Sequence, residues 1–158
     1  MLRVTAKQQV MREIVDLLSI LDNEEAKFRW GEKGLACSSV DVSHVAMLEM
    51  MVADECFETY EVEPMEIGID LRKLGEVLAL AGPNDLIELD YDQATSSMVV
   101  HVSEVRRTIR GLDVSMIEEV KLPSLDFEGM KVVISTEKFA RSFTVSYTHL
   151  RAHETKAN

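Results

Sequence analysis

The order of predicted secondary structure repeats along this chain, and that repetition constrains the fold more than any single residue does. The segment "AKQQVMREIVDLLSIL" has apolar residues at helical spacing, with Thr5 as its predicted N-cap, and short strands follow it. After Pro64 the pattern starts again, with a strand, an amphipathic helix that ends before Gly82 and Pro83, and three strands. We therefore predict an α+β fold of two strand–helix–three-strand units. The predicted helices are residues 6–20 and 71–81, and the predicted strands are residues 26–30, 34–40, 44–50, 56–63, 66–70, 85–92, 96–103 and 105–114.

Composition limits the classes of protein to which the chain can belong. Its 158 residues are enough for one core of ordinary size and fewer than two typical domains need. A net charge of −11 argues against tight wrapping of nucleic acid, although it says nothing about how the charge is distributed. The sequence has neither an apolar run long enough to predict a membrane span nor the N-terminal pattern of a signal peptide. Cys37 and Cys56 lack metal-like spacing, and we expect both thiols to be reduced and buried.

A third repeat of the strand–helix pattern is predicted to start beyond the second unit. Aligning Val4 with Val133 preserves the polar and apolar pattern of the first helix, which predicts another helix from residue 136. The intervening segment "EEVKLPSLDFEG" is acidic and contains a proline, as linkers often do. It also exposes several apolar side chains, which makes it a candidate binding surface. These apolar residues are Val120, Leu122, Leu125 and Phe127.

His44 is the first candidate functional residue, because it lies between a polar turn and an apolar run in "SSVDVSHVAMLEM". A histidine there could be a base, a metal ligand, a structural hydrogen-bonding group or part of an apolar binding surface. From the sequence alone we favour the structural hydrogen bond. No glycine-rich phosphate loop, Ser/His/Asp set or paired carboxylates on a loop indicate an enzyme.

Six segments follow one another in a recognisable order: "SSVDVSHVAMLEM", "CFETYEVE", "IGIDLRKLGEVLALAG", "DLIELDYD", "RRTIRGLDV" and "KLPSLDF". In this order they resemble the sliding clamps of archaea and eukaryotes, the PCNA family of DNA polymerase processivity factors, and most closely the archaeal form. The D-x-S-H-V turn and the helix ending in "LAG" before an acidic strand are the most specific pieces. The resemblance runs from residue 1 to about residue 143.

The resemblance implies a DNA-clamp fold, with antiparallel sheets outside and helices lining the hole of a three-subunit ring. It implies a first clamp domain at residues 1–119, an interdomain connector at 120–128 and the start of a second clamp domain at 129–143. The implied function is a non-enzymatic subunit of a homotrimer, without a cofactor, that encircles duplex DNA and tethers DNA polymerase, the clamp loader and other clients. Such a protein would be cytoplasmic and chromosome-bound in an archaeon, or nuclear in a eukaryote. The alternatives are a specialised paralogue within a heterotrimer and an enzyme acting on DNA.

Clamps of this family bind client peptides in a groove under the connector, and the resemblance assigns residues to that groove. A concave apolar surface with a few polar groups suits a peptide that becomes ordered on binding. His44 would then be a polar group at the rim of the groove rather than a base. The assigned groove residues are Val40, His44, Val45, Met47, Val120, Leu122, Leu125 and Phe127.

The resemblance also implies which residues face DNA and which strand joins the subunits. Glu13 and Glu76 stand where other clamps are more basic, so the predicted DNA-facing helices are close to neutral. Contacts to the phosphates would be weak and independent of DNA sequence. The predicted DNA-facing residues are Lys7, Arg12, Arg72, Lys73, Lys138 and Arg141, and the predicted subunit edge contains Val105, Arg107, Ile109 and Gly111.

The last residues do not continue the clamp pattern. The segment "VSYTHLRAHET" looks like the translation of a sequencing-library adapter, and we expect residues 144–158 to be a non-native tail. His149 and His153, which stand four residues apart as in helical zinc sites, are therefore left out of the site. Only His44 and His101 remain, too few for a histidine-based metal site.

Overall fold

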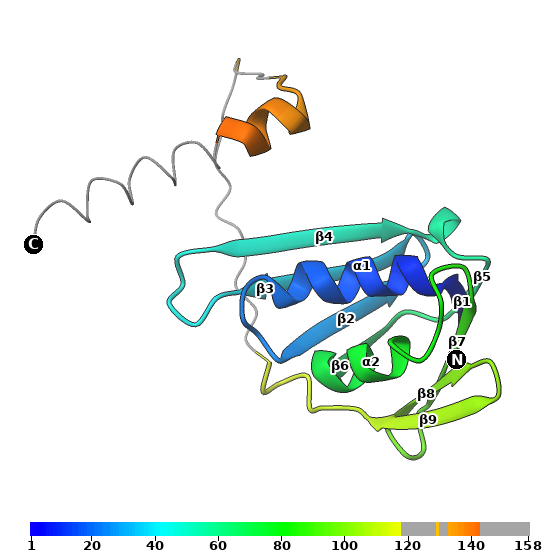
Figure 1. Cartoon of the computed structure of the whole chain (residues 1–158). Helices are drawn as coiled ribbons and strands as arrows, with labels where there is room; N and C mark the ends of the chain where they lie inside the picture. The colour runs from blue at the N-terminus through cyan, green and yellow to red at the C-terminus, as the bar shows by residue number, and fades with distance from the viewer. Residues whose placement is uncertain (118–128, 130–132, 143–158) are drawn as a thin grey trace, which may run out of the picture. The chain divides into compact units, whose positions relative to one another are not determined.

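The structure is a computed structural model of the chain, and it describes residues 1–117, 129 and 133–142 (Figure 1). Residues 1–122 and 123–158 are two separate compact units, and this division falls within the predicted connector. The first unit is built from β1 (Leu2–Lys7), α1 (Gln8–Ser19), β2 (Glu25–Gly31), β3 (Gly34–Val40), β4 (Met47–Ala53), a short 3-10 helix η1 (Asp54–Cys56), β5 (Thr59–Val62), β6 (Met65–Asp70), α2 (Leu71–Leu78), β7 (Leu86–Asp92), β8 (Ser97–Val102) and β9 (Val105–Arg110).

The two halves of this unit exchange their first strands. Sheet A has the strand order β5-β1-β7-β8-β9, and sheet B has the order β4-β3-β2-β6. Strand β1 of the first half therefore pairs with β7 of the second, and β6 of the second half pairs with β2 of the first, both antiparallel. The two pairings are equivalent in register: β1 runs from Leu2 opposite Tyr91, and β6 runs from Met65 opposite Trp30. Neither half can complete its sheet alone.

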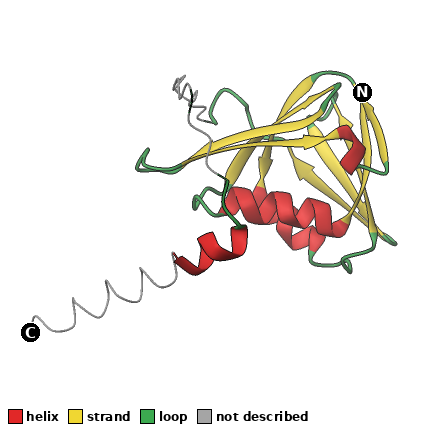
Figure 2. Ribbon diagram, turned by 90° about the horizontal axis from the view of Figure 1, so that it is seen from above, coloured by secondary structure: helices red, strands yellow, loops and turns green. Residues whose placement is uncertain are grey.

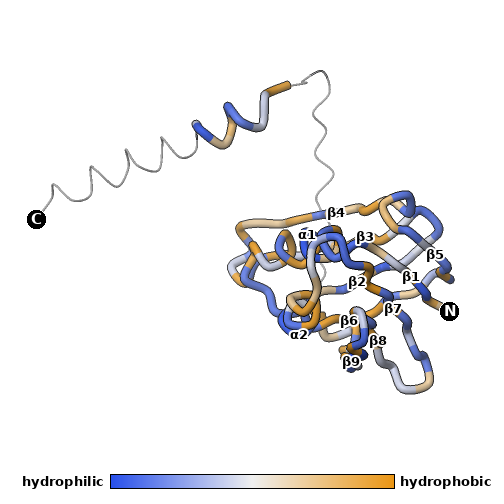
Figure 3. Tube along the Cα trace, turned by 45° about the vertical axis from the view of Figure 1, so that its right-hand side comes forward, coloured by the Kyte–Doolittle hydropathy of each residue, from blue (hydrophilic) through white to orange (hydrophobic). Residues whose placement is uncertain are grey.

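One face of each strand and helix is buried, as the alternating sequence pattern predicts. Along β1 the side chains of Leu2, Val4 and Ala6 are buried, whereas Arg3 and Lys7 are exposed. Both helices lie together on one side of the strands (Figure 2), and hydrophilic and hydrophobic residues occur along each of them (Figure 3). Their buried apolar side chains are Met11, Ile14, Val15 and Leu18 of α1 and Leu71, Leu74, Val77 and Leu78 of α2.

The beginning of α1 differs from the prediction. Thr5, the predicted N-cap, lies within β1, and the helix begins at Gln8. The amide of Gln8 donates to the carbonyl oxygen of Asp85 at 2.8 Å, and the amide of Gln9 donates to that of Pro83 at 3.1 Å. Carbonyl groups from the α2–β7 loop thus satisfy donors that a side-chain cap would otherwise satisfy. In α2 the Asp70 carboxylate does cap the helix, since it accepts from the amide of Lys73 at 2.9 Å.

The first half departs from the three-strand unit, and its strands differ in bounds from the predicted ranges. Four strands follow α1, and the strand predicted at residues 56–63 is the short β5 (Thr59–Val62), which pairs beside β1 at the edge of sheet A with Tyr60 opposite Val4. The strand predicted at residues 44–50 is β4, which begins only at Met47 and extends to Ala53. The residues before Met47 belong to a loop that is organised by a side chain.

An aromatic cluster joins the two sheets. The ring of Trp30 in β2 lies 6.1 Å from that of Tyr60 in β5 and 5.9 Å from that of Phe57, measured between centroids. The Tyr60 hydroxyl donates to the carbonyl oxygen of Gly31 at 2.7 Å. Trp30 is the only tryptophan in the chain and is buried, so its fluorescence will report on this junction.

The two cysteines are free thiols, and only one of them is buried as predicted. Burial raises the pKa of Cys37 to about 12, so this thiol is inert near neutral pH. Cys56 lies in η1 and is exposed, which corrects the prediction that both are buried.

The second unit is described only at residues 129 and 133–142, and it contains the helix predicted from residue 136. The described part of this helix is residues 136–142, where Lys138 and Arg141 are exposed. The predicted connector and the predicted tail lie outside the described residues.

We expect Ile69→Ala to destabilise both sheets together. Ile69 is a second-half residue that is fully buried in sheet B, where it pairs with Ala26 of the first half. Removing a buried Ile side chain to Ala costs about 2–5 kcal/mol of unfolding free energy. Urea unfolding should be followed by Trp30 fluorescence and by far-UV circular dichroism, and both midpoints should fall equally.

Ile20→Ala is the matched control, because Ile20 is 72% exposed. This variant should stay within about 0.5 kcal/mol of the parent chain. Separate midpoints for the two probes in Ile69→Ala would contradict the interdependence of the two halves.

Candidate functional site

The loop between β3 and β4 is organised by the carboxylate of Asp41. One oxygen accepts from the amides of Val45 at 2.7 Å and Ala46 at 2.6 Å, and the other accepts from the amide of Ser43 at 3.2 Å. The Asp41 amide in turn donates to the carbonyl oxygen of Ala46 at 3.0 Å. The hydrogen bonds from the amides of Ala46, then Val45 and Ser43, lower the pKa of Asp41 below its ordinary value. A negative charge thus holds the loop together near neutral pH.

His44 lies at the turn of this loop. Its backbone has a φ of 55°, and its amide donates to the carbonyl oxygen of Asp41 at 2.9 Å. The side chain is exposed, and its electrostatic effect also lowers the pKa of Asp41. No cluster of three or more potential metal-ligating side chains occurs among the described residues.

The same loop presents apolar side chains to solvent. Val42 is 83% exposed and Val45 is 86% exposed, and the Val45 amide donates to Asp41. Val40 and Met47, at the ends of the flanking strands, are half-buried. Two large apolar side chains held in solvent by a fixed loop form a surface suited to binding another molecule.

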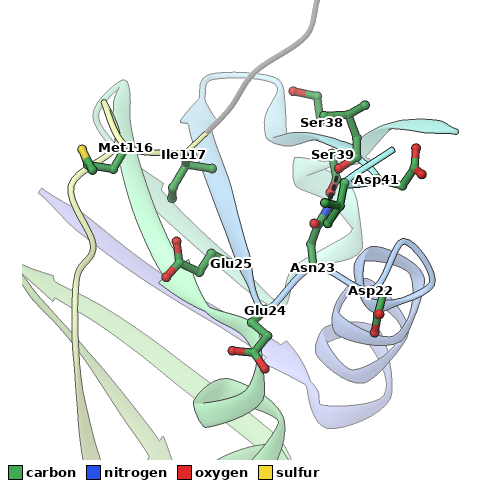
Figure 4. A pocket seen from close by; sticks show the side chains of 11 residues that line it. Asp22, Asn23, Glu24, Glu25, Ser38, Ser39, Asp41, Met116 and Ile117 are labelled. Atoms are coloured by element: carbon green, nitrogen blue, oxygen red, sulfur yellow. Dashed lines mark hydrogen bonds between the residues drawn. The ribbon is translucent and has the colours of Figure 1, made fainter. Parts of the chain in front are cut away.

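A hollow of about 420 Å³ lies beside this loop (Figure 4). Val40 and Val42 form its apolar wall on one side, and Met116 and Ile117, which follow β9, form the other. Asn23 shapes the floor, since its side-chain amide donates to the Ser39 hydroxyl at 2.7 Å and to the Val40 carbonyl at 2.6 Å. The remaining described residues around the hollow are polar or acidic: Asp22, Glu24, Glu25, Ser38 and Asp41.

Residues 112–117, which we call the lead segment, carry the chain from β9 to the predicted connector. Leu112 forms an isolated bridge with Gly68 of β6, and its amide donates to the Gly68 carbonyl at 2.9 Å. Asp113 then shapes a turn by accepting from the Ser115 hydroxyl at 2.7 Å and the Ser115 amide at 2.9 Å, contacts that lower its pKa. The segment reaches the hollow at Met116 and Ile117.

The structure thus gathers part of the predicted client groove. Val40 lines the hollow, while His44, Val45 and Met47 belong to the adjacent loop or to the strand that begins there. The predicted connector residues Val120, Leu122, Leu125 and Phe127 lie outside the described residues. The sequence analysis placed Asp41 and Val42 in the D-x-S-H-V turn but gave them no role, and it missed Ile117. An Asp two residues before a Ser is a known turn signal that could have identified the role of Asp41.

Of the predicted DNA-facing residues in the first unit, Arg12, Arg72 and Lys73 lie on the helices, whereas Lys7 is the last residue of β1. All four are exposed, and three of them are paired with acids. The pairs are Lys7 with Glu58 at 3.8 Å, Arg12 with Asp16 at 2.9 Å and Lys73 with Asp70 at 2.9 Å. Arg12 and Arg72 line a hollow of about 400 Å³ between the two helices. Two guanidinium groups therefore flank the groove between α1 and α2.

The predicted subunit edge is β9, which is the last strand of sheet A. Arg107 is exposed and Val105 is 37% exposed, so both reach the surface. Ile109 is buried in the core of this unit and could contribute only its backbone to an interface. Gly111 follows the strand, and its amide donates to the Ser96 carbonyl at 2.7 Å.

A family model described as "Proliferating cell nuclear antigen, N-terminal domain" matches residues 1–124. A "DNA polymerase sliding clamp" of Methanocorpusculum labreanum is 30% identical over 119 residues, which cover 75% of this chain and 48% of that protein. The "DNA polymerase sliding clamp" of Methanoregula boonei is 31% identical over 138 residues, which cover 87% of this chain and 55% of that protein. The chain spans about half the length of the curated relatives that it matches.

The solved structure titled "C-terminal region of FEN-1 bound to A. fulgidus PCNA" matches with a TM-score of 0.74 and 25% identity, over 80% of this chain and 51% of that one. It supports the DNA-clamp fold. No helix among the described residues is long and apolar enough to cross a membrane. Because the family model matches most of its length, the chain belongs to the proliferating cell nuclear antigen family of sliding clamps.

Proposed function

We propose that the whole protein is a sliding-clamp subunit that assembles into a ring around duplex DNA and tethers DNA polymerase. The observation that carries this proposal is the packing of α1 and α2 together on one side of the strands, in a chain whose relatives are DNA polymerase sliding clamps (Figure 2). Such an arrangement gives a closed ring a helical inner surface and a sheet outer surface. The protein itself catalyses no reaction in this proposal and requires no cofactor. Its archaeal relatives suggest a cytoplasmic protein held on the chromosome.

The charge on the helices suits a ring that slides. Arg12 and Lys73 are each paired with a carboxylate of the same helix or its cap, so the helical surface is close to neutral. Attraction to phosphates would then be weak and independent of DNA sequence. A closed ring stays on DNA because of its topology, and weak contacts let it move.

The hollow beside the Asp41 loop is the proposed client groove. Its apolar walls and exposed valines suit the apolar side chains of a peptide. Its polar residues can form hydrogen bonds with the backbone of that peptide. Flap endonuclease, polymerase and the clamp loader are the classes of client that we propose. The related PCNA of A. fulgidus was solved with the C-terminal region of FEN-1, which supports a peptide client of this type.

The exposed edge of β9 is the proposed contact between subunits. An unpaired edge strand presents a row of backbone donors and acceptors that another strand can complete. Arg107 and the half-covered Val105 would lie at that contact, with Gly111 at its end.

The ring mechanism is tested with the protein encoded by the complete reading frame of the source DNA. Its subunits should form a trimer in solution, remain on circular nicked plasmid and run off after the plasmid is cut. A protein that dissociates equally fast from circular and linear DNA would contradict encirclement. If trimers form only when a paralogue is present, the proposed homotrimer is wrong and the protein is a subunit of a heterotrimer.

We expect the double variant Arg12→Ala, Arg72→Ala to weaken the salt dependence of duplex binding by that ring. Each arginine that contacts a phosphate displaces counterions, so the slope of log K against log[salt] should fall by about 0.9 per lost contact. Fluorescence anisotropy with a labelled duplex at several salt concentrations measures this slope.

Arg3→Ala is the control, because Arg3 is paired with Asp90 at 3.0 Å on the strand face turned away from the helices. It should leave the slope unchanged. Equal slopes for the parent protein, the double variant and Arg3→Ala would show that Arg12 and Arg72 do not contact DNA.

We expect Asp41→Ala to abolish binding of a client peptide without unfolding the chain. The three amides that point at the carboxylate would lose their acceptor, and Val42 and Val45 would no longer be held in place. A nuclear magnetic resonance titration with a synthetic peptide of the C-terminal region of FEN-1 measures the loss. Asp92→Ala is the control, since Asp92 shapes the β7–β8 turn by accepting from Thr95 and Ala94. If the peptide causes the same chemical-shift changes in Asp41→Ala as in the parent chain, this role of Asp41 is contradicted.

The structure of the loop between β3 and β4 should depend on pH. Because folding lowers the pKa of Asp41, its contribution to stability is complete above the ordinary carboxyl value of about 3.9. The contribution is lost as the pH falls through the lower folded pKa. The hydrogen bonds of the Val45 and Ala46 amides should therefore persist at neutral pH, and their amide shifts should show an acid transition whose midpoint lies below the ordinary carboxyl value. A midpoint above the ordinary value would show that the carboxylate is not stabilised by these amides.

A further inference from the structure

Gly68 occupies an unusual place in sheet B. Its neighbours Ile67 and Ile69 point into the core, so position 68 faces the other side of the sheet, away from the helices. On that face β6 otherwise carries the polar Glu66 and Asp70. Gly68 is nevertheless buried, because the lead segment lies directly over it.

The space over Gly68 has no room for a side chain. A Cβ atom built there would lie 2.7 Å from the carbonyl oxygen of Leu112, 2.9 Å from the Leu112 Cβ and 2.8 Å from the Ile117 Cδ1. The Ile117 atom is the end of a side chain and can shift by itself, but the Leu112 oxygen is backbone, so the lead segment would have to move at Leu112. The close approach is also fixed by the hydrogen bond from the Leu112 amide to the Gly68 carbonyl at 2.9 Å.

The backbone conformation does not explain the glycine. Gly68 is not among the described residues with positive φ, and it pairs regularly with Lys27 of β2. A glycine in a strand interior weakens the strand, and it often marks the close approach of another backbone. Here the approaching backbone is the lead segment, which explains why a strand position carries no side chain.

The contact has a consequence for the hollow beside the Asp41 loop. Ile117, which rests on Gly68, also lines that hollow opposite Val40 and Val42. The distance between the two apolar walls is therefore set by how closely the lead segment can approach β6. We propose that Gly68 is a positioning residue, whose missing side chain lets the lead segment fix the connector-side wall of the client groove. This inference rests on the proposed peptide-binding function of that groove.

The test compares Gly68→Ala with Gly31→Ala in the full 158-residue chain. Gly31 is also a strand residue of sheet B, in β2, and a Cβ atom built there meets nothing within 4 Å. Amide hydrogen exchange of Leu112 reports whether the lead segment stays docked. A resonance titration with the peptide of the C-terminal region of FEN-1 reports binding, and thermal unfolding reports overall stability.

Gly68→Ala should accelerate exchange at Leu112 and weaken peptide binding by about 2- to 30-fold, the range for residues that act without touching the ligand. Gly31→Ala should change neither. Unchanged exchange at Leu112 in Gly68→Ala would overturn the docking role, and faster exchange with parental peptide affinity would overturn the positioning role. If the parent chain binds no peptide, the proposed groove fails, whereas exchange at Leu112 still decides whether Gly68 docks the segment.

Discussion

The exchange of first strands between the two halves is the interaction on which the rest of the structure depends. Strand β1 completes sheet A and β6 completes sheet B, each with partners from the other half. The helices that follow these strands are thereby brought to the same side, where α1 and α2 pack together (Figure 2). Without the exchange each half would expose one face of a three-stranded sheet and a single amphipathic helix, too little apolar contact for a stable core. The shared helical surface and the docked lead segment are both consequences of this pairing.

Both walls of the proposed groove are fixed by small local features rather than by the core. On one side a single carboxylate, Asp41, gathers three amides of a loop that exposes two valines. On the other side the absence of a side chain at Gly68 admits the lead segment. Asp41 satisfies backbone amides of a loop that lies outside the strands, and Gly68 lets the backbone of the lead segment approach a strand that is itself regularly paired. A groove built this way is preorganised, so less of the binding free energy is spent on ordering the protein.

Much of the fold could be predicted from the sequence because alternation and helical spacing record which side of an element is buried. Strand β3 lies where it was predicted, at residues 34–40, and α2 begins at Leu71 as expected. The pattern does not record which strands are neighbours, so the exchange of β1 and β6 was not predicted. The capping of α1 by the carbonyl of Asp85 escaped prediction for the same reason, since it joins residues distant in sequence. In the site, the sequence pointed to His44 as the candidate functional residue, whereas the carboxylate of Asp41 organises the loop.

The charges on the sheet edges restrict how copies of such a unit can associate. Strand β9 carries Arg106, Arg107 and Arg110, whereas β4, the outer strand of sheet B, carries Glu49 and is followed by Asp54 and Glu55 in η1. Two β9 edges brought together would oppose arginine to arginine, and like charges facing each other across strands are destabilising. Pairing β9 with an edge of neutral or acidic character avoids that repulsion. Of the four edge strands β5, β9, β4 and β6, the arginine-rich β9 is therefore poorly suited to pairing with a second copy of itself.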